Sequence, residues 1–271
     1  MGEKKFNNGE VEFERTDFVL KSHESKLMQC SLFAPKSDLL STCIVYMHGN
    51  ASCRLEGLEY AETLMQNCLS VFVYDAAGCG LSEGEYITLG WREHKDLALI
   101  VEHLHSLKKF DKIVLWGRSM GAVTALMYLA EQPSHQEKVA CAVLDSGFND
   151  LAELMKSVAG SNPALQFFAG LFIPQIKKLV LEKTGMQIDE FKVAPKLKAV
   201  NSVPAYFLHG KDDDFVLPSN SEQNHAAYAC ERKTLRFVPG DHNGERPVWA
   251  IREILDFIAT HTGALEEEPK K

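Results

Sequence analysis

Short apolar runs rich in β-branched and aromatic residues alternate along this chain with segments that read as helices. Several runs are continuously apolar, which is typical of strands covered on both faces. They fall at 43–47, 70–75, 113–116, 139–145, 205–209 and 234–238. The predicted helices between them are Leu55–Gln66, Trp91–Leu107, Ala122–Ala130, Ser221–Tyr228 and Arg246–Thr260. This alternation predicts an α/β protein whose mostly parallel sheet carries helices on both faces.

The N-terminal part has a different pattern. Residues 13–34 read as a β-hairpin with a polar turn near 22–26, which we expect to form an antiparallel edge of the sheet. The hairpin brings the predicted sheet to about eight strands. A chain of 271 residues with 45% hydrophobic residues has ample material for one core, so we expect residues 1–271 to form a single domain.

One connection is unusually long. Residues 148–202 separate two neighbouring predicted strands, and excess length of this kind is commonly functional. The segment contains three short helical patterns, broken at Gly160, Pro163 and Pro174. We interpret 148–202 as a helical cap inserted between the strands near 145 and 205, above the carboxyl ends of the strands. An ordinary set of packing helices is the alternative.

Composition narrows the class of partner. The formal net charge is −8 and the chain has no basic stripe, so we expect no nucleic acid partner. The longest apolar run has seven residues, too few for a transmembrane segment. The seven cysteines are scattered, without a C-x-x-C pair, and the N-terminus has no apolar signal segment, which favours a cytoplasmic location. The oligomeric state stays open.

Ser119 is the candidate nucleophile. It lies between Gly117 and Gly121, directly after a strand-like run and before an apolar helical run. A sharp strand-to-helix turn exposes the hydroxyl, and the backbone N–H of Met120 at the start of the helix would form half of an oxyanion hole. A second G-x-S-x-G copy surrounds Ser82, but no apolar helix pattern follows it. Ser119 could instead be an ordinary helix N-cap.

A serine nucleophile needs a base and an acid to orient that base. His242 follows a predicted strand in a glycine-containing loop, which would place its imidazole above the carboxyl edge of the sheet. His48 and His209 precede glycines at strand ends, and we expect them to support loops. Candidate acids are the three consecutive aspartates 212–214 and Asp145, all at strand ends.

These features resemble the α/β-hydrolase superfamily, with similarity to its serine aminopeptidase and monoacylglycerol-lipase branch. The order serine 119, acid, histidine 242 is that of this fold. The family's H-G-x-x-D spacing, counted from His209, implies that Asp213 is the acid. His48-Gly49-Asn50-Ala51 is similar to the family's oxyanion turn, so the resemblance implies that the N–H of Asn50, or the N–H of Ala51 as the alternative, completes the hole. Residues 74–82 resemble the family's D-x-R-G-x-G-x-S loop, with Ala77 where arginine is usual, so a loop-anchoring cation is missing there.

The sequence therefore predicts a serine hydrolase that cleaves an ester, thioester or small amide of a small-molecule acyl substrate, with no cofactor and no metal. A peptidase would use the same triad, and a non-catalytic protein that binds a ligand or partner is the alternative from another class. Arg118 could favour an anionic substrate or point into the protein. Five apolar residues of the predicted cap could line an acyl pocket or belong to the core: Phe167, Phe168, Leu171, Phe172 and Ile173.

Overall fold

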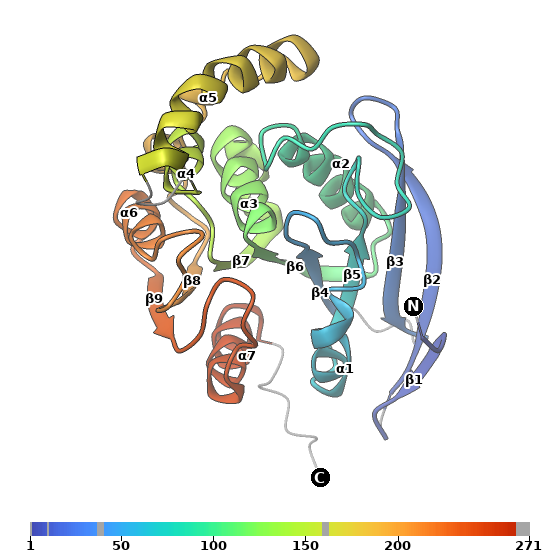
Figure 1. The fold of residues 1–271 in the computed structure, drawn as a ribbon. Helices are drawn as coiled ribbons and strands as arrows, with labels where there is room; N and C mark the ends of the chain where they lie inside the picture. The colour runs from blue at the N-terminus through green and yellow to red at the C-terminus, as the bar shows by residue number, and fades with distance from the viewer. Residues whose placement is uncertain (1, 10, 37–40, 159–162, 264–271) are drawn as a thin grey trace.

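A single nine-stranded sheet runs through the protein (Figure 1). The computed structural model describes residues 2–9, 11–36, 41–158 and 163–263, and of residues 41, 158 and 163–171 it describes the backbone only. The strand order is β1-β2-β3-β5-β4-β6-β7-β8-β9. The strands are β1 (Lys5–Asn7), β2 (Glu12–Lys21), β3 (Leu27–Pro35), β4 (Ser41–Met47), β5 (Ser70–Tyr74), β6 (Phe110–Arg118), β7 (Val139–Asp145), β8 (Ala205–Gly210) and β9 (Lys233–Val238).

Strands β4 to β9 are parallel, whereas β1, β2 and β3 add an antiparallel edge. The predicted hairpin and its turn at 22–26 are confirmed. The predicted number of eight strands is wrong by one, because β1 has only three residues and no apolar run announces it. It forms because its backbone pairs with β2 and Phe6 packs against the buried ring of Phe13.

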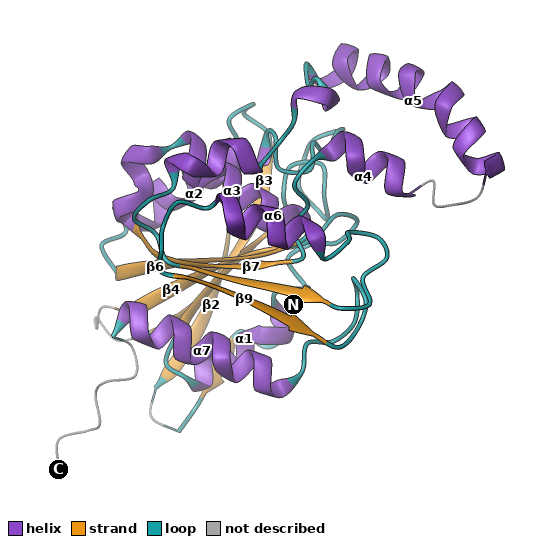
Figure 2. Ribbon diagram, turned by 90° about the vertical axis from the view of Figure 1, so that its left-hand side faces the viewer, coloured by secondary structure: helices purple, strands orange, loops and turns teal. Residues whose placement is uncertain are grey.

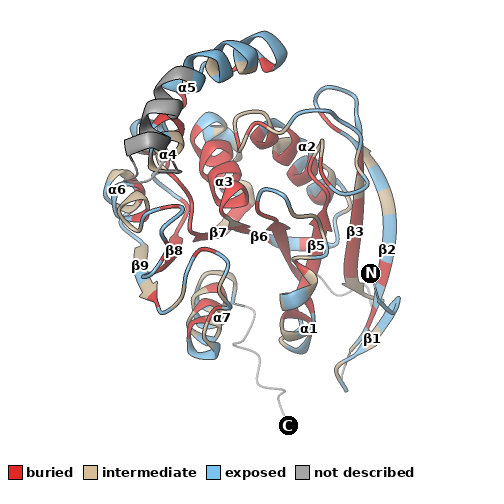
Figure 3. Cartoon of the chain, viewed as in Figure 1, coloured by how far each residue is buried: buried red, intermediate tan, exposed pale blue. Residues whose placement is uncertain are grey.

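Helices cover both faces of the sheet (Figure 2). Helices α1 and α7 lie on one face, and α2, α3 and α6 lie on the other. Each layer buries its own apolar cluster against the sheet, as the red segments in Figure 3 show. The bounds are α1 (Leu58–Gln66), α2 (Glu93–Ser106), α3 (Met120–Glu131), α6 (Ser219–Ala227) and α7 (Val248–Thr262).

The long connection forms α4 (Leu151–Val158), α5 (Pro163–Thr184) and the short helices η2 (Ile188–Glu190) and η3 (Ala194–Ala199). Helix α5 extends beyond the layer of α2, α3 and α6 (Figure 2). The predicted break at Pro174 is wrong, because α5 continues through it. A proline removes one backbone hydrogen bond and strains the preceding turn, and Figure 2 shows α5 bending along its length instead of ending. Gly160 lies outside the described residues.

The strand order reverses at the centre of the sheet. The chain passes from β4 to β5 on one side, and then crosses to β6 on the other side of β4. Ligands of open α/β sheets bind at such a switch point, outside the carboxyl ends of the strands. The register pairs Met47 with Gly117, so the turn after β4 and the turn after β6 leave the sheet side by side.

Candidate active site

Ser119 forms the sharp turn between β6 and α3. Its backbone has φ 51° and ψ −113°, a conformation that costs a non-glycine residue about 1–3 kcal/mol. The Ser119 N–H donates to the carbonyl of Asp145 at 2.7 Å, and the N–H of Val123 donates to the Ser119 carbonyl at 3.1 Å. Among the described contacts of Ser119, none is a side-chain cap on α3, so the hydroxyl does not serve as an N-cap.

Glycines on both sides of Ser119 make this turn possible. A Cβ on Gly117 would lie 2.3 Å from backbone atoms of Gly121, and a Cβ on Gly121 would lie 2.0 Å from the carbonyl oxygen of Met47. Both distances are far below van der Waals contact. The G-x-S-x-G spacing is therefore a steric requirement of helix α3 starting against the ends of β4 and β6.

The structure brings Ser119, His242 and Asp213 together, although 123 and 29 residues separate them in the chain. The Nε2 of His242 lies 3.0 Å from the Oγ of Ser119, and its Nδ1 lies 2.7 Å from Oδ2 of Asp213. All three residues are buried, with exposed fractions of 7%, 8% and 2% in the order serine, histidine, aspartate. A hydroxyl, an imidazole and a carboxylate thus form one hydrogen-bonded row at the carboxyl edge of the sheet.

Four groups hold the carboxylate of Asp213. Its Oδ1 accepts the N–H groups of Phe215 and Val216 at 3.1 and 2.8 Å. Its Oδ2 faces His242 and, at 3.2 Å, the Nε2 of His209. Burial by itself raises the pKa of Asp213, but hydrogen bonds from His209 and His242 outweigh it and hold the pKa well below its usual range. Asp213 is therefore a carboxylate at neutral pH.

The other candidate acids have different surroundings. Asp212 and Asp214 are exposed, so only the middle member of the three aspartates turns inward. Asp145 is buried at the end of β7, where its two oxygens accept Nε and Nη2 of Arg246 at 2.8 and 2.9 Å. Since a guanidinium occupies Asp145, the structure pairs the histidine with Asp213 instead.

The rival Ser82 is fixed in a loop. Its hydroxyl donates to the carbonyl of Asp75 at 2.7 Å and accepts the N–H of Gln29 at 2.8 Å. The Asp75 carboxylate also accepts the N–H groups of Arg54 and Leu81, and the Arg54 guanidinium lies 3.9 Å from it. Arg54, which lies between β4 and α1, therefore places a cation beside the loop in which Ala77 carries none. Ser82 acts as an anchor of that loop.

The proposed oxyanion donors lie on the two adjoining turns. Met120 is the first residue of α3, directly after Ser119. Asn50 is exposed in the turn after β4, and its neighbour Ala51 has φ 56°. The preceding N–H, that of Gly49, donates to both oxygens of Glu56 at 3.2 Å.

Three residues with contacts in or near the site were not predicted from the sequence to have them. His209 was expected to support a loop, and it also approaches Asp213. The available signal was its position four residues before that aspartate, as the first residue of the H-G-x-x-D spacing. Glu56 and Arg246, each inside a predicted helix, are partly or fully buried charges in loops. Their partners lie far away in the chain, so no local pattern could identify them.

Arg118 points into the protein. Its Nε and Nη2 donate to the two oxygens of Glu56 at 2.8 and 2.9 Å. The hydrogen bond that Arg118 donates to Glu56, opposed by burial, raises the pKa of Arg118 above its already high usual value, so the guanidinium stays charged. Its charge is used within the protein.

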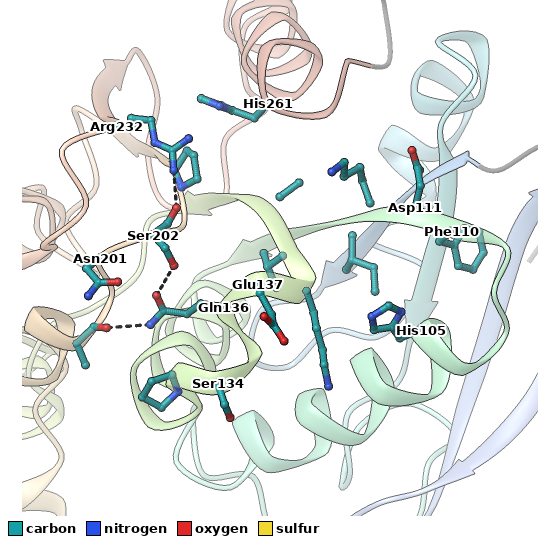
Figure 4. Close-up of a pocket in the computed structure, with 18 residues that line it drawn as sticks. His105, Phe110, Asp111, Ser134, Gln136, Glu137, Asn201, Ser202, Arg232 and His261 are labelled. Atoms are coloured by element: carbon teal, nitrogen blue, oxygen red, sulfur yellow. Dashed lines mark hydrogen bonds between the residues drawn. The ribbon is translucent and has the colours of Figure 1, made fainter.

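A cleft lies at the opposite edge of the sheet, where β6, β7 and β8 begin (Figure 4). Its volume is about 660 Å³, and Ser119, Asp213 and His242 do not line it. At this cleft the buried Gln136 bonds to the carbonyls of Leu129 and Ala199 and to the hydroxyl of Ser202. Its polar groups are satisfied by the protein itself.

The described residues include no disulfide-bonded cysteine and no cluster of metal-ligating side chains. The seven cysteines are free thiols, and burial raises the pKa of both Cys30 and Cys79 to about 12. Within residues 2–9, 11–36, 41–158 and 163–263, no three His, Cys, Asp or Glu side chains gather closely enough to hold a metal ion. The same residues contain no helix with the length and apolar character needed to cross a bilayer.

Solved structures with this architecture define the fold class. The esterase Pf2001 of Pyrococcus furiosus superimposes with a TM-score of 0.69 at 19% identity, covering 94% of this chain and 92% of the esterase. The alpha/beta hydrolase GrgF from Penicillium sp. sh18 gives a TM-score of 0.70 at 17% identity, covering 92% of this chain and 99% of GrgF. The protein therefore has the α/β-hydrolase fold, as the sequence predicts.

The model of the serine aminopeptidase S33 family matches residues 40–199, and the chain belongs to that family. Ser119 lies inside the matched segment, whereas Asp213 and His242 lie beyond it. Among curated relatives, the uncharacterized protein YqkD of Bacillus subtilis is 26% identical over 220 residues, covering 78% of this chain and 68% of YqkD. The uncharacterized YfhR of Escherichia coli O157:H7 is 25% identical over 210 residues, covering 77% of this chain but only 65% of YfhR. The family match and the solved structures together place the chain in a family with the α/β-hydrolase fold.

Proposed function

We propose that this protein is a serine hydrolase that cleaves an ester, thioester or small amide through an acyl-enzyme on Ser119. The observation that carries the proposal is the buried row of hydrogen-bonding groups, 3.0 Å from Ser119 Oγ to His242 Nε2 and 2.7 Å from His242 Nδ1 to Asp213. A nucleophile, its base and the orienting acid need these contacts and this order.

The proposed reaction has two halves. Ser119 Oγ attacks the acyl carbon while His242 Nε2 takes the hydroxyl proton, and the proton then goes to the leaving alcohol, thiol or amine as its bond to the acyl carbon breaks. Water attacks the acyl-enzyme in the same way and releases the acid. The Asp213 carboxylate, kept ionised by its hydrogen bonds, holds the ring of His242 and stabilises its protonated form.

The backbone N–H groups of Asn50 and Met120 are the proposed oxyanion donors. Negative charge develops on the substrate oxygen as the tetrahedral intermediate forms, and the N-terminus of α3 offers both a free N–H and the positive end of a helix dipole. The side-by-side exit of β4 and β6 from the sheet supports a site between the two turns.

Residues 148–202 are the proposed cap within the single domain. An apolar cleft of about 350 Å³ lies between α5, α4 and the loop before α2, with Met155, Ile176 and Leu179 in its walls. Phe172 is 58% exposed, and the side chains of Phe167, Phe168 and Leu171 lie outside the described residues. Ser119, Asp213 and His242 do not line this cleft, so its apolar walls would favour an apolar acyl group only where the acyl chain reaches from Ser119 to the cap.

Replacing Ser119 tests the nucleophile. The Ser119→Ala variant should lose ester turnover and labelling by a fluorophosphonate probe, while its thermal unfolding midpoint stays at or above that of the wild-type protein. Ser82→Ala is the matched control, because Ser82 has the same G-x-S-x-G context, and it should keep labelling. Continued labelling of Ser119→Ala would reject the assignment.

A substrate panel separates the alternatives that share this site. Acyl esters of increasing chain length, thioesters and aminoacyl amides should be compared on the wild-type protein by kcat/KM. We expect kcat/KM to rise with chain length, because the proposed cap cleft is apolar; a flat response would argue against that cleft. Preference for aminoacyl amides would indicate the peptidase alternative, and failure of the wild-type protein to label or turn over would indicate a non-catalytic binding protein.

A further inference from the structure

The carboxylate of Glu56 lies at the junction of two loops of the candidate site. Its side chain is only 8% exposed. It accepts two hydrogen bonds from Arg118, one from the hydroxyl of Tyr46 at 2.9 Å and one from the N–H of Gly49 that both oxygens share. The arginine contact is bidentate, the geometry that fixes direction as well as distance. Glu56 therefore ties the turn after β4 to the residue before Ser119.

Arg118 completes the junction. Its backbone is joined directly to Ser119, and its third nitrogen, Nη1, lies 3.2 Å from Oδ1 of Asn243 in the loop that carries His242. A Cβ on Gly49 would lie 2.7 Å from Nη2 of Arg118, so the guanidinium rests against the backbone of the turn. One ion pair thus touches the oxyanion turn, the nucleophile turn and the histidine loop.

The position of this pair matters for the chemistry. An oxyanion donor stabilises the transition state only when it sits within hydrogen-bond reach of the developing charge, and sites left loose by about 1 Å lose most of that benefit. Asn50 follows Gly49 directly, and Gly49 is held at both ends. Its N–H is anchored on Glu56, and its carbonyl, which shares a peptide group with the Asn50 N–H, lies 2.7 Å from Nδ1 of His48. Glu56 and His48 therefore fix the backbone that carries the Asn50 N–H.

A second buried pair provides a contrast. Arg246 binds both oxygens of Asp145 and the carbonyls of Asp241 and Gly244. It therefore holds the histidine loop to the end of β7, and its described contacts do not include the oxyanion turn. Of the two ion pairs, only Glu56–Arg118 has a described contact with the turn after β4.

We propose that Glu56 and Arg118 form a positioning pair that sets the backbone N–H of Asn50 relative to Ser119. This inference rests on the proposed serine hydrolase function. In this proposal neither side chain touches the substrate. The pair acts through the backbone of the turn after β4, which it holds in place. Breaking the pair should weaken stabilisation of the transition state while leaving binding of the substrate ground state nearly unchanged.

The test uses Glu56→Gln, which keeps the size of the side chain and removes the charge. We expect kcat to fall roughly 10–100-fold, somewhat less than the ~10²–10³-fold cost of losing a donor outright, with KM changed by less than about threefold. Affinity for phenylboronic acid, whose boron adds to Ser119 Oγ to give a tetrahedral adduct with an oxygen in the oxyanion hole, should fall by the same factor as kcat. The acid limb of the pH–rate profile should not move, because the contact between His242 and Asp213 is intact.

Two further variants keep the test decisive if Glu56→Gln folds poorly. Arg118→Lys keeps the charge but loses the bidentate contact, and should lower kcat and boronate affinity together by a smaller factor. The double variant Glu56→Gln/Arg118→Met should lose no more kcat than the worse of its two single variants, Glu56→Gln and Arg118→Met, because the two side chains act as one unit. Gln136→Ala, at the opposite edge of the sheet, controls for loss of stability and should leave kcat unchanged.

The outcomes separate the two levels of the argument. If the wild-type protein hydrolyses esters through Ser119 and Glu56→Gln keeps full kcat, or loses kcat without losing boronate affinity, the positioning pair is wrong and the proposed function stands. If the wild-type protein is not labelled at Ser119, the proposed function fails, and the positioning inference fails with it.

Discussion

The two edges of the sheet use buried polar groups differently. At the carboxyl edge, the polar atoms of Ser119, His242 and Asp213 point at one another in a row that ends on a hydroxyl. At the opposite edge, Gln136 is one of the residues that line the cleft of Figure 4, and its amide holds backbone carbonyls and a serine in place. The two edges therefore differ in how their polar side chains are used: three of them converge on one another at the carboxyl edge, whereas Gln136 bonds to the protein around it.

The strongest way to break this comparison is Asp213→Asn at the carboxyl edge. The asparagine keeps the shape but favours the wrong tautomer of His242, and in serine proteases the equivalent change lowers kcat about 10⁴-fold. We expect a loss of roughly 10³–10⁴ in kcat for ester hydrolysis, measured under saturating substrate. A loss of less than about tenfold would mean that Asp213 does not orient the base.

Gln136→Ala makes the corresponding change at the opposite edge. It leaves the buried carbonyl of Leu129 without its partner and removes the bonds to the more exposed Ala199 carbonyl and Ser202 hydroxyl, which should lower the free energy of unfolding by about 1–3 kcal/mol. Urea denaturation followed by fluorescence measures this loss. The kcat/KM should stay within twofold of the wild-type value, and a large fall in it would show that this edge takes part in catalysis.

The smallest expected effect concerns acid. Because the pKa of Asp213 is lowered in the folded state, its charge adds stability above about pH 4, near the pKa of an unfolded aspartate, and that stability is lost as the pH falls from there toward the lower folded pKa. Urea midpoints at pH 7, 4 and 3 should therefore fall more steeply for the wild-type protein than for Asp213→Asn. Parallel profiles would contradict the lowered pKa.

The parts of the fold and of the candidate site that could be predicted from the sequence are those with a local pattern in the chain. The parallel strands, the hairpin and the turn around Ser119 leave local signals, because apolar runs and glycine spacing are set by neighbours in the chain. The fold class is confirmed, and the resemblance to α/β hydrolases narrowed the acid to Asp213 among three consecutive aspartates.

What the sequence missed depends on distant or marginal contacts. Strand β1 is too short to show periodicity, and α5 continues through Pro174 because a proline weakens a helix without having to end it. The Glu56–Arg118 and Asp145–Arg246 pairs join residues 62 and 101 positions apart, so only three-dimensional proximity reveals them.

The backbone conformation of Ser119 also has a consequence for the stability of the protein. A chain selected for durability alone would place glycine at this position, since glycine adopts a positive φ without penalty. Serine holds this conformation because the surrounding strands and helix impose it, and the rest of the fold must be stable enough to absorb that strain. If Ser119 is the nucleophile that we propose, its reactivity therefore comes at a cost in stability at the same residue.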